Sequence, residues 1–196
     1  MGFLAFLQVM NQYLSQRSNI RDSTMPVRDT HTTYVMGIDL GLKGAVAIMN
    51  LNGKLHLLKT MPVSCDSNGK NKIDVLKLFD WLAENSLSPQ NISLACMERV
   101  HSFGNEARPS LFSFGKGTGR VEALLELEGF PYIQVTPQTW KASILRGTKK
   151  DKKAAIGYVQ TRYPDSNIGN HDGLADAVCL AEYCRLSLVA EEPACV

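Results

Sequence analysis

The stretch GIDLGLKGAVAIMN, residues 37–50, places an acidic side chain inside an apolar pattern. Gly37, Ile38 and Leu40, followed by the apolar residues 45–48, are typical of buried strands. Asp39 lies in the middle of the first apolar run, where an ionised carboxylate is costly to desolvate. A cation, or a ligand that brings one, would offset this cost. We therefore expect Asp39 to have charged partners elsewhere in the chain.

Composition and length indicate one globular domain. The chain has 196 residues, of which 44% are hydrophobic and 20% are charged. No apolar run is long enough to predict a membrane span. The five cysteines form no C-x-x-C pair, so neither a zinc site nor a disulfide framework follows, and a reducing compartment is favoured. We expect a flexible N-terminal extension over residues 1–33, a folded domain over 34–190 and a tail over 191–196.

The basic residues are unevenly distributed, although the net charge is only +2. A single acid, Asp151, lies within a segment that holds six basic residues: Lys141, Arg146, Lys149, Lys150, Lys152 and Lys153. Such a cluster is typical either of a phosphate-binding surface or of a solvated helix and loop. The charge pattern alone leaves both interpretations open.

The order of the expected elements predicts an α/β fold. Residues 34–40, 44–50 and 54–60 read as strands with short glycine-marked links, which predicts an antiparallel meander. Further strands are expected at 92–98 and 132–135, and helices at 73–85, 119–129, 137–145, 148–163 (with Thr148 and Asp151 as a capping box) and 172–189. A meander followed by β-α-β alternation predicts a mixed five-stranded sheet, with antiparallel and parallel strands, flanked by helices.

Three more carboxylates are candidate partners of Asp39. Glu98 ends the fourth expected strand, and Asp172 and Asp176 lie four residues apart in HDGLADA, on one face of the last helix. Each acid alone could be an ordinary solvated residue. The surrounding run LADAVCLA, however, is typical of a buried segment, so acids there need a physical reason.

Two-metal phosphodiester chemistry would supply that reason. Two divalent ions about 4 Å apart can clamp the attacking and leaving oxygens, and magnesium prefers oxygen ligands. Asp39 would then bridge the ions, with Glu98, Asp172 and Asp176 as the other ligands. His171 could orient or deprotonate water, or it could simply face solvent at the start of the helix.

These residues occur in an order that resembles the RuvC-type Holliday junction resolvases of the ribonuclease H-like superfamily. The resembling stretches span roughly residues 35–185 and are GIDLGLKGAVAIM, MERVHS, GTGRVEALLELEGFPYIQVTPQTWKASILRGTKKDKKAAI and HDGLADAVCLAEY. Leu40 replaces the usual proline of the first motif. The motifs TPQTWK and HDGLADA resemble those of the phage and organellar branch more closely than those of the bacterial branch.

The resemblance implies a ribonuclease H-like nuclease domain over residues 34–190 that cuts four-way DNA junctions symmetrically. It also implies a homodimer that uses magnesium or manganese and works in the cytoplasm, at the nucleoid, in a host cytoplasm or in an organelle. Asp39, Glu98 and Asp176 match the family pattern, whereas Gly173 occupies the position of the penultimate ligand. Asp172 or His171 must substitute, and we expect Asp172. The resemblance places Lys141 and Lys152 near the scissile phosphate.

Residue types outside the acidic set predict DNA contacts. Lysine and arginine neutralise phosphates, and aromatic side chains stack on unpaired bases. The candidates are Lys116 and Arg120 at an expected glycine-rich helix start, Lys149, Lys150, Lys152 and Lys153, and Phe103, Phe112 and Phe114 in the loop after Glu98. The aromatic residues could instead belong to the core.

Three functions other than junction resolution are alternatives at the level of the sequence. A ribonuclease H-like nuclease that acts on RNA or an RNA–DNA hybrid would need the same acids. A junction-binding module without catalysis would not need all four of them. An actin-like kinase also begins with GIDLG, but such chains are normally far longer.

Overall fold

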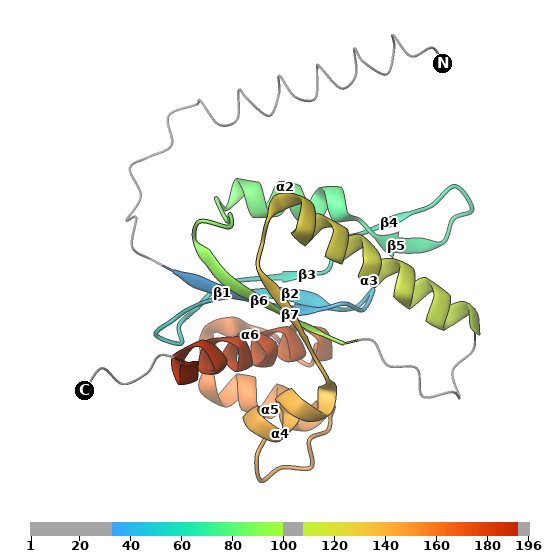
Figure 1. Cartoon of the computed structure of the whole chain (residues 1–196). Helices are drawn as coiled ribbons and strands as arrows, with labels where there is room; N and C mark the ends of the chain where they lie inside the picture. The colour runs from blue at the N-terminus through green and yellow to red at the C-terminus, as the bar shows by residue number, and fades with distance from the viewer. Residues whose placement is uncertain (1–32, 100–107, 192–196) are drawn as a thin grey trace. The chain divides into compact units, whose positions relative to one another are not determined.

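The computed structural model of the protein describes residues 33–99 and 108–191. Its centre is a five-stranded sheet in the order β3-β2-β1-β6-β7 (Figure 1). The strands are β1 (Tyr34–Asp39), β2 (Ala45–Asn50), β3 (Leu55–Thr60), β6 (Ile92–Glu98) and β7 (Tyr132–Val135). β1, β2 and β3 pair antiparallel, whereas β1, β6 and β7 pair parallel. The predicted mixed sheet is therefore confirmed.

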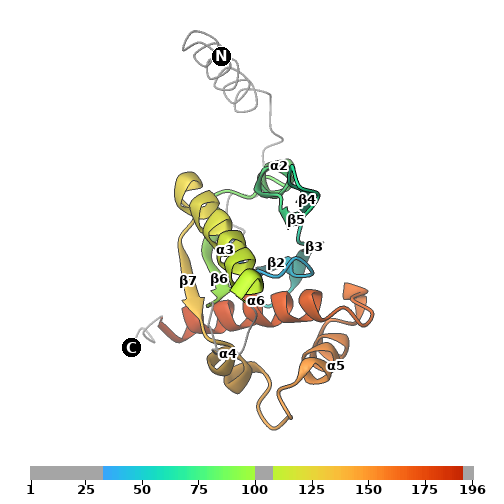
Figure 2. The same ribbon diagram turned by 90° about the vertical axis from the view of Figure 1, so that its right-hand side faces the viewer.

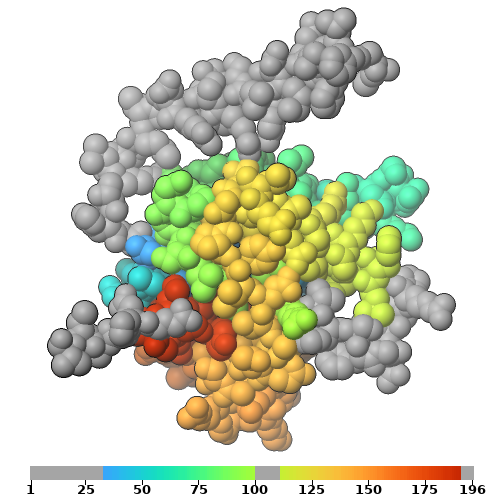
Figure 3. Space-filling model, viewed as in Figure 1, coloured from blue at the N-terminus to red at the C-terminus, as the bar shows by residue number. Residues whose placement is uncertain are grey.

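Helices cover both faces of this sheet (Figures 1 and 2). One face carries α2 (Val75–Glu84) and α3 (Arg108–Glu128), and the other carries α4 (Pro137–Ile144), α5 (Lys152–Arg162) and α6 (Asp172–Glu191). Figure 3 shows α3, in yellow and yellow-green, across the front of the molecule. Among the helices of residues 33–99 and 108–191, none is long and apolar enough to cross a membrane.

The sheet separates two apolar cores, because successive strand side chains point to opposite faces. On the first face, Ile38 and Ile48 pack with Leu78 and Val121. On the second face, the core includes Val35, Ala47, Trp140 and Ala177. The four residues that follow Asp176, from Ala177 to Leu180, are all fully buried, as the apolar run in the sequence predicts.

The contact between β1 and α6 positions the end of the sheet that bears the acids. A Cβ atom on Gly37 would collide with the carbonyl oxygen of Ala177 and the amide nitrogen of Ala181. Only glycine therefore allows α6 to lie this close to β1. Gly173 makes a second close approach, because a Cβ there would lie 2.8 Å from the Cα of Gly44.

Two features on the sheet face that α2 and α3 cover differ from the sequence prediction. A hairpin of β4 (Val63–Cys65) and β5 (Asn71–Ile73) was not predicted, because three-residue strands are too short to show a clear periodicity. α3 begins at Arg108 rather than at residue 119. At Gly117 a Cβ would lie only 3.2 Å from the side chain of Ile73, so the glycine-rich stretch accommodates the hairpin. Tertiary packing here overrides the low helix propensity of glycine.

The start of α5 also differs from the prediction. Asp151, rather than Thr148, is the N-cap, and its carboxylate accepts a hydrogen bond from the amide of Ala154 at 2.9 Å. Lys150 has φ = 58°, a left-handed conformation that a helix beginning at Thr148 would exclude. The predicted capping box is therefore wrong.

Candidate active site

Four carboxylates meet at one end of the sheet. Asp39 ends β1 and Glu98 ends β6, and these neighbouring parallel strands pair up to Ile38 and Met97. Asp172 is the first residue of α6, and Asp176 follows one turn later. Asp39 and Asp176 each interact electrostatically with the other three acids. The three elements therefore bring the four predicted acids into one electrostatic cluster.

Asp39 is strongly affected by this environment. Burial raises the pKa of its carboxyl to about 6, and Glu98 and Asp172 add to the increase. The amide of Gly41, which donates to Asp39 Oδ1 at 3.3 Å, and the nearby Lys141 act in the opposite direction. A cation bound beside Asp39 would stabilise its ionised form.

Asp176 shows the same effect more strongly. Burial raises the pKa of its carboxyl to about 7, Lys141 lowers it, and the three other acids raise it. Its Oδ1 atom is buried and has no hydrogen-bond partner among the described residues. Buried polar atoms are nearly always paired, so this oxygen is well suited to accept a ligand.

Asp172 differs from these two acids because a lysine neutralises it. Lys152 donates a short hydrogen bond to Asp172 Oδ2, and this contact holds the pKa of Asp172 below its usual range. The same contact raises the pKa of Lys152. Both side chains are at least one-third exposed, so solvent screens the pair. Lys152 therefore lies beside the acidic cluster and is paired with one of its members.

Glu98 is oriented by a buried tryptophan. The indole Nε1 of Trp140, which is completely buried in α4, donates a hydrogen bond to Glu98 Oε2 at 3.1 Å. The Nζ of Lys141 lies 5.0 Å from the centre of the same ring. Trp140 thus contacts both an acid and a base of the site. Trp140 was not among the sequence-predicted site residues, because its hydrogen bond joins residues 42 positions apart.

His171 is the residue immediately before α6. Its Nδ1 accepts a hydrogen bond from the amide of Leu174 at 3.1 Å, as an N-cap side chain does. Because Nδ1 is the acceptor, a neutral ring carries its proton on Nε2. In this arrangement His171 offers no nitrogen lone pair to a metal ion. Asp172 is consequently the better candidate for the fourth ligand.

The donor chemistry of the cluster fits a hard divalent cation. All four acids supply oxygen atoms, which magnesium and manganese prefer. Burial is the main cause of the raised pKa values of Asp39 and Asp176, and Oδ1 of Asp176 has no hydrogen-bond partner among the described residues, so both features are compatible with a bound cation. Within the described ranges, no three acidic, histidine or cysteine side chains are already close enough to form a ligand shell.

The predicted DNA-contact residues lie in several places. Lys149, Lys150 and Lys153 are exposed around the start of α5. Lys116 is exposed within α3, and the Nη1 of Arg120 donates to the carbonyl of Ile73 at 3.1 Å. These two residues therefore do not lie at a helix start, and the corresponding prediction is wrong, because α3 begins eight residues before Lys116.

The aromatic candidates need a similar correction. Phe112 and Phe114 lie in α3 and not in a loop, with exposed fractions of 73% and 36%. Neither of them belongs to the core. Phe103 lies outside the described residues.

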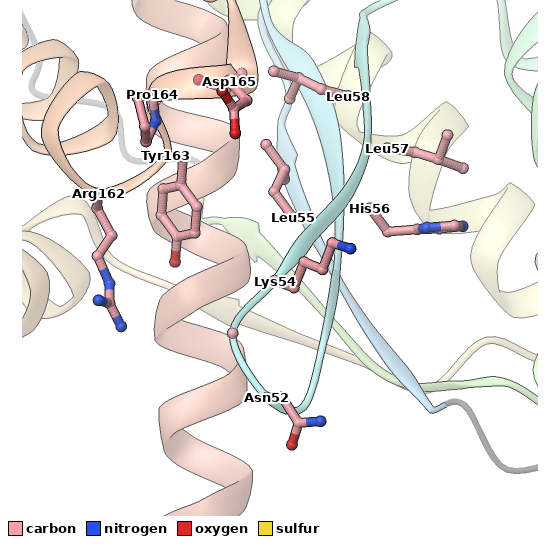
Figure 4. Close-up of a pocket in the computed structure, with 12 residues that line it drawn as sticks. Asn52, Lys54, Leu55, His56, Leu57, Leu58, Arg162, Tyr163, Pro164 and Asp165 are labelled. Carbon is pink, nitrogen blue, oxygen red and sulfur yellow. The ribbon is translucent and has the colours of Figure 1, made fainter.

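A cavity of about 520 Å³ lies at the opposite end of the sheet. It is bounded by the β2–β3 turn and β3 on one side, including Lys54, and by the segment from Arg162 to Ser166 on the other (Figure 4). Asn50, which precedes this turn, pairs with Tyr34 at the start of β1, whereas Asp39 ends that strand. None of the four acids lines this cavity.

Comparisons with known proteins identify the fold. No protein-family model and no curated protein matches the sequence. The structure is similar to Thermus thermophilus RuvC in complex with a Holliday junction substrate, with a TM-score of 0.55 and 14% sequence identity over 80% of this chain and 96% of that chain.

Two further solved structures are similar at a lower level. A second Thermus thermophilus RuvC structure has a TM-score of 0.49, with 16% identity over 81% of this chain and 97% of that one. The yeast mitochondrial Holliday junction resolvase Ydc2 has a TM-score of 0.42, with 18% identity over 88% and 85%. At these identities, the phage, organellar and bacterial branches are not separated. The fold is ribonuclease H-like, as in RuvC.

Proposed function

We propose that this protein is a metal-dependent endonuclease that resolves four-way DNA junctions by phosphodiester hydrolysis. The observation that carries the proposal is the electrostatic cluster of Asp39, Glu98, Asp172 and Asp176 at the end of a RuvC-like sheet. Two of these acids carry a raised pKa, and one of their oxygens is unpaired. Such a cluster in an apolar surrounding is costly unless a cation is bound.

The four acids would hold magnesium, with manganese as a substitute. When bound, two such ions stabilise the attacking and leaving oxygens of the phosphodiester. Asp39 interacts electrostatically with the acids of both β6 and α6 and is our candidate for the shared ligand. Lys141 lowers the pKa of both Asp39 and Asp176, so it favours the ionised forms that a metal requires.

Binding of DNA would depend on basic and aromatic side chains around the acids. Lysines at the start of α5 can neutralise backbone phosphates. Lys152, which is paired with Asp172, extends this basic surface to the acidic cluster. The exposed rings of Phe112 and Phe114 on α3 can stack on unpaired bases near a branch point.

Resolution of a junction also sets requirements on assembly and location. A junction is resolved by two cuts, and the described residues of each chain hold one such acidic cluster, so we propose a homodimer. We further propose that the protein works where it meets DNA, in the cytoplasm, at the nucleoid or in an organelle.

Cleavage assays with magnesium on a four-way junction, an RNA–DNA hybrid and a plain duplex test this function. The full chain should cut the junction selectively, and Asp39→Asn should bind the junction but not cut it. Preferred cleavage of the hybrid would assign the protein to a different ribonuclease H-like activity. Junction binding without cleavage by the unmodified protein would identify a binding module instead.

A further inference from the structure

The β1–β2 turn, residues 41–44, lies directly against the acidic cluster. A Cβ on Gly173 would meet the carbonyl oxygen of Lys43 and would lie 3.0 Å from Asp39 Oδ2. Since Gly173 lies between Asp172 and Asp176, the backbone of Lys43 contacts the segment that carries both helical acids. The turn therefore forms part of the rim of the proposed active site.

This turn is held in one conformation. The amide of Gly44 donates to the carbonyl of Gly41 at 2.8 Å, and the carbonyl of Gly44 accepts from the amide of Met61 at 2.8 Å. A Cβ on Gly44 would collide with the carbonyl oxygen of Asp39, so a larger residue would displace the turn. These contacts fix the backbone of Lys43 relative to that of Asp39.

Lys43 differs from the other lysines near the acids. Lys152 is paired with Asp172, and Lys141 lies over the ring of Trp140. Lys43 is exposed, and within the described part of the chain it makes no ion pair. Its ammonium group can therefore bind a phosphate without breaking an ion pair to residues 33–99 or 108–191.

We infer that Lys43 is a DNA-contact residue whose ammonium group binds a backbone phosphate next to the phosphodiester that is cut. This inference rests on the proposed function. A lysine in the turn next to the acidic cluster would hold the DNA strand against the four acids. It would also offset part of the repulsion between the DNA phosphates and the carboxylates. The residue was not among the sequence-predicted contacts, because it lies outside the basic cluster at 141–153.

The chain offers a closely matched control for this role. Lys54 is also an exposed lysine in a short turn between neighbouring strands, but its turn joins β2 to β3 at the other end of the sheet (Figure 4). Lys43→Ala and Lys54→Ala therefore each remove one positive charge from an exposed turn, at opposite ends of β2. Lys43→Arg keeps the charge.

The experiment measures the affinity of the full chain for a four-way junction in EDTA over a range of salt concentrations. If Lys43 neutralises one phosphate, Lys43→Ala should weaken binding several-fold and reduce the slope of log affinity against log salt by about 0.9. Lys54→Ala and Lys43→Arg should keep the slope of the unmodified protein. An unchanged slope in Lys43→Ala would overturn the inference while leaving the proposed function intact.

A second measurement locates the phosphate. Single methylphosphonates on either side of the cut site remove one charge at a time from the junction. One of them should weaken binding by the unmodified protein but cause no further loss with Lys43→Ala. Equal losses for both proteins at every position would also overturn the inference. If the unmodified protein binds no junction at all, the proposed function fails and the inference fails with it.

Discussion

The indole Nε1 of Trp140 donates a hydrogen bond to Oε2 of Glu98 at 3.1 Å and so joins α4 to the end of β6. A donor that is fixed in a core restricts the orientation of the carboxylate it meets. Trp140 is completely buried, so water is poorly placed to substitute for it. Hydrogen bonds to charged groups contribute roughly 1.5–3 kcal/mol.

Trp140→Phe should therefore impair the site while retaining an aromatic ring in the core. We expect single-turnover cleavage to fall at least about tenfold, or about 1.4 kcal/mol in the barrier, and the magnesium midpoint to rise. Trp81→Phe, on the half-buried face of α2, is the matched control and should change neither quantity. Normal cleavage and a normal midpoint in a folded Trp140→Phe protein would show that Glu98 does not need this hydrogen bond.

The raised pKa of Asp176 predicts how stability depends on pH in the absence of metal. A carboxyl with a higher pKa in the folded state, here about 7 against an ordinary 3.8, binds its proton more tightly when the protein is folded. Its contribution to stability is present below pH 4 and is lost as the pH rises from about 4 to about 7. At pH 8 the ionised side chain should therefore destabilise the metal-free protein.

Asp176→Asn removes this penalty, because the amide is uncharged and can donate to a neighbouring acid. In EDTA at pH 8 we expect the variant to be more stable than the unmodified protein, by on the order of 2 kcal/mol. The difference should shrink at pH 5. Urea unfolding measures both values, with the exposed Asp165→Asn as the control. An equal pH dependence in both proteins would contradict the proposed environment of Asp176.

Asp172 and His171 are predicted to have separate roles. Asp172→Asn should lower cleavage at least about tenfold more than His171→Ala and should raise the magnesium concentration required. His171→Ala should instead lower stability by about 1 kcal/mol, because the amide of Leu174 loses its cap. His171→Ser, which restores a capping side chain, should recover that stability. If His171→Ala is inactive while Asp172→Asn stays active, the histidine is a ligand.

The lysines at the start of α5 should act on DNA affinity and not on the chemical step. Alanine at Lys149, Lys150 and Lys153 together should reduce the salt slope by about 0.9 for each phosphate that these lysines neutralise. Lys152 is left unchanged because it is paired with Asp172. Binding assays with the four-way junction and with a duplex should show similar losses. A salt slope equal to that of the unmodified protein would show that these lysines face only solvent.

The amino-acid sequence alone predicted the mixed sheet and the strand or helix that carries each of the four acids. Apolar runs with glycine-marked links predict the strands. The β-α-β order predicts parallel pairing, with helices on the faces of the sheet. Asp39 was expected inside the first strand and Glu98 at the end of the fourth, and the structure places both acids at the ends of the parallel neighbours β1 and β6. The four-residue spacing of Asp172 and Asp176 likewise put both on one face of α6.

The surroundings of these acids, in contrast, depend on tertiary packing. Trp140 reaches Glu98 across 42 positions, and Lys152 reaches Asp172 across 20, and no local periodicity encodes such pairs. The glycine-rich stretch of α3 is helical although glycine has a low helix propensity, and Gly117 in it lies against Ile73 of β5. The turn that carries Lys43 lies against α6 because Gly44 and Gly173 allow the two backbones to approach closely. Distant contacts of this kind form only in the packed chain, so they were not predictable from residue order.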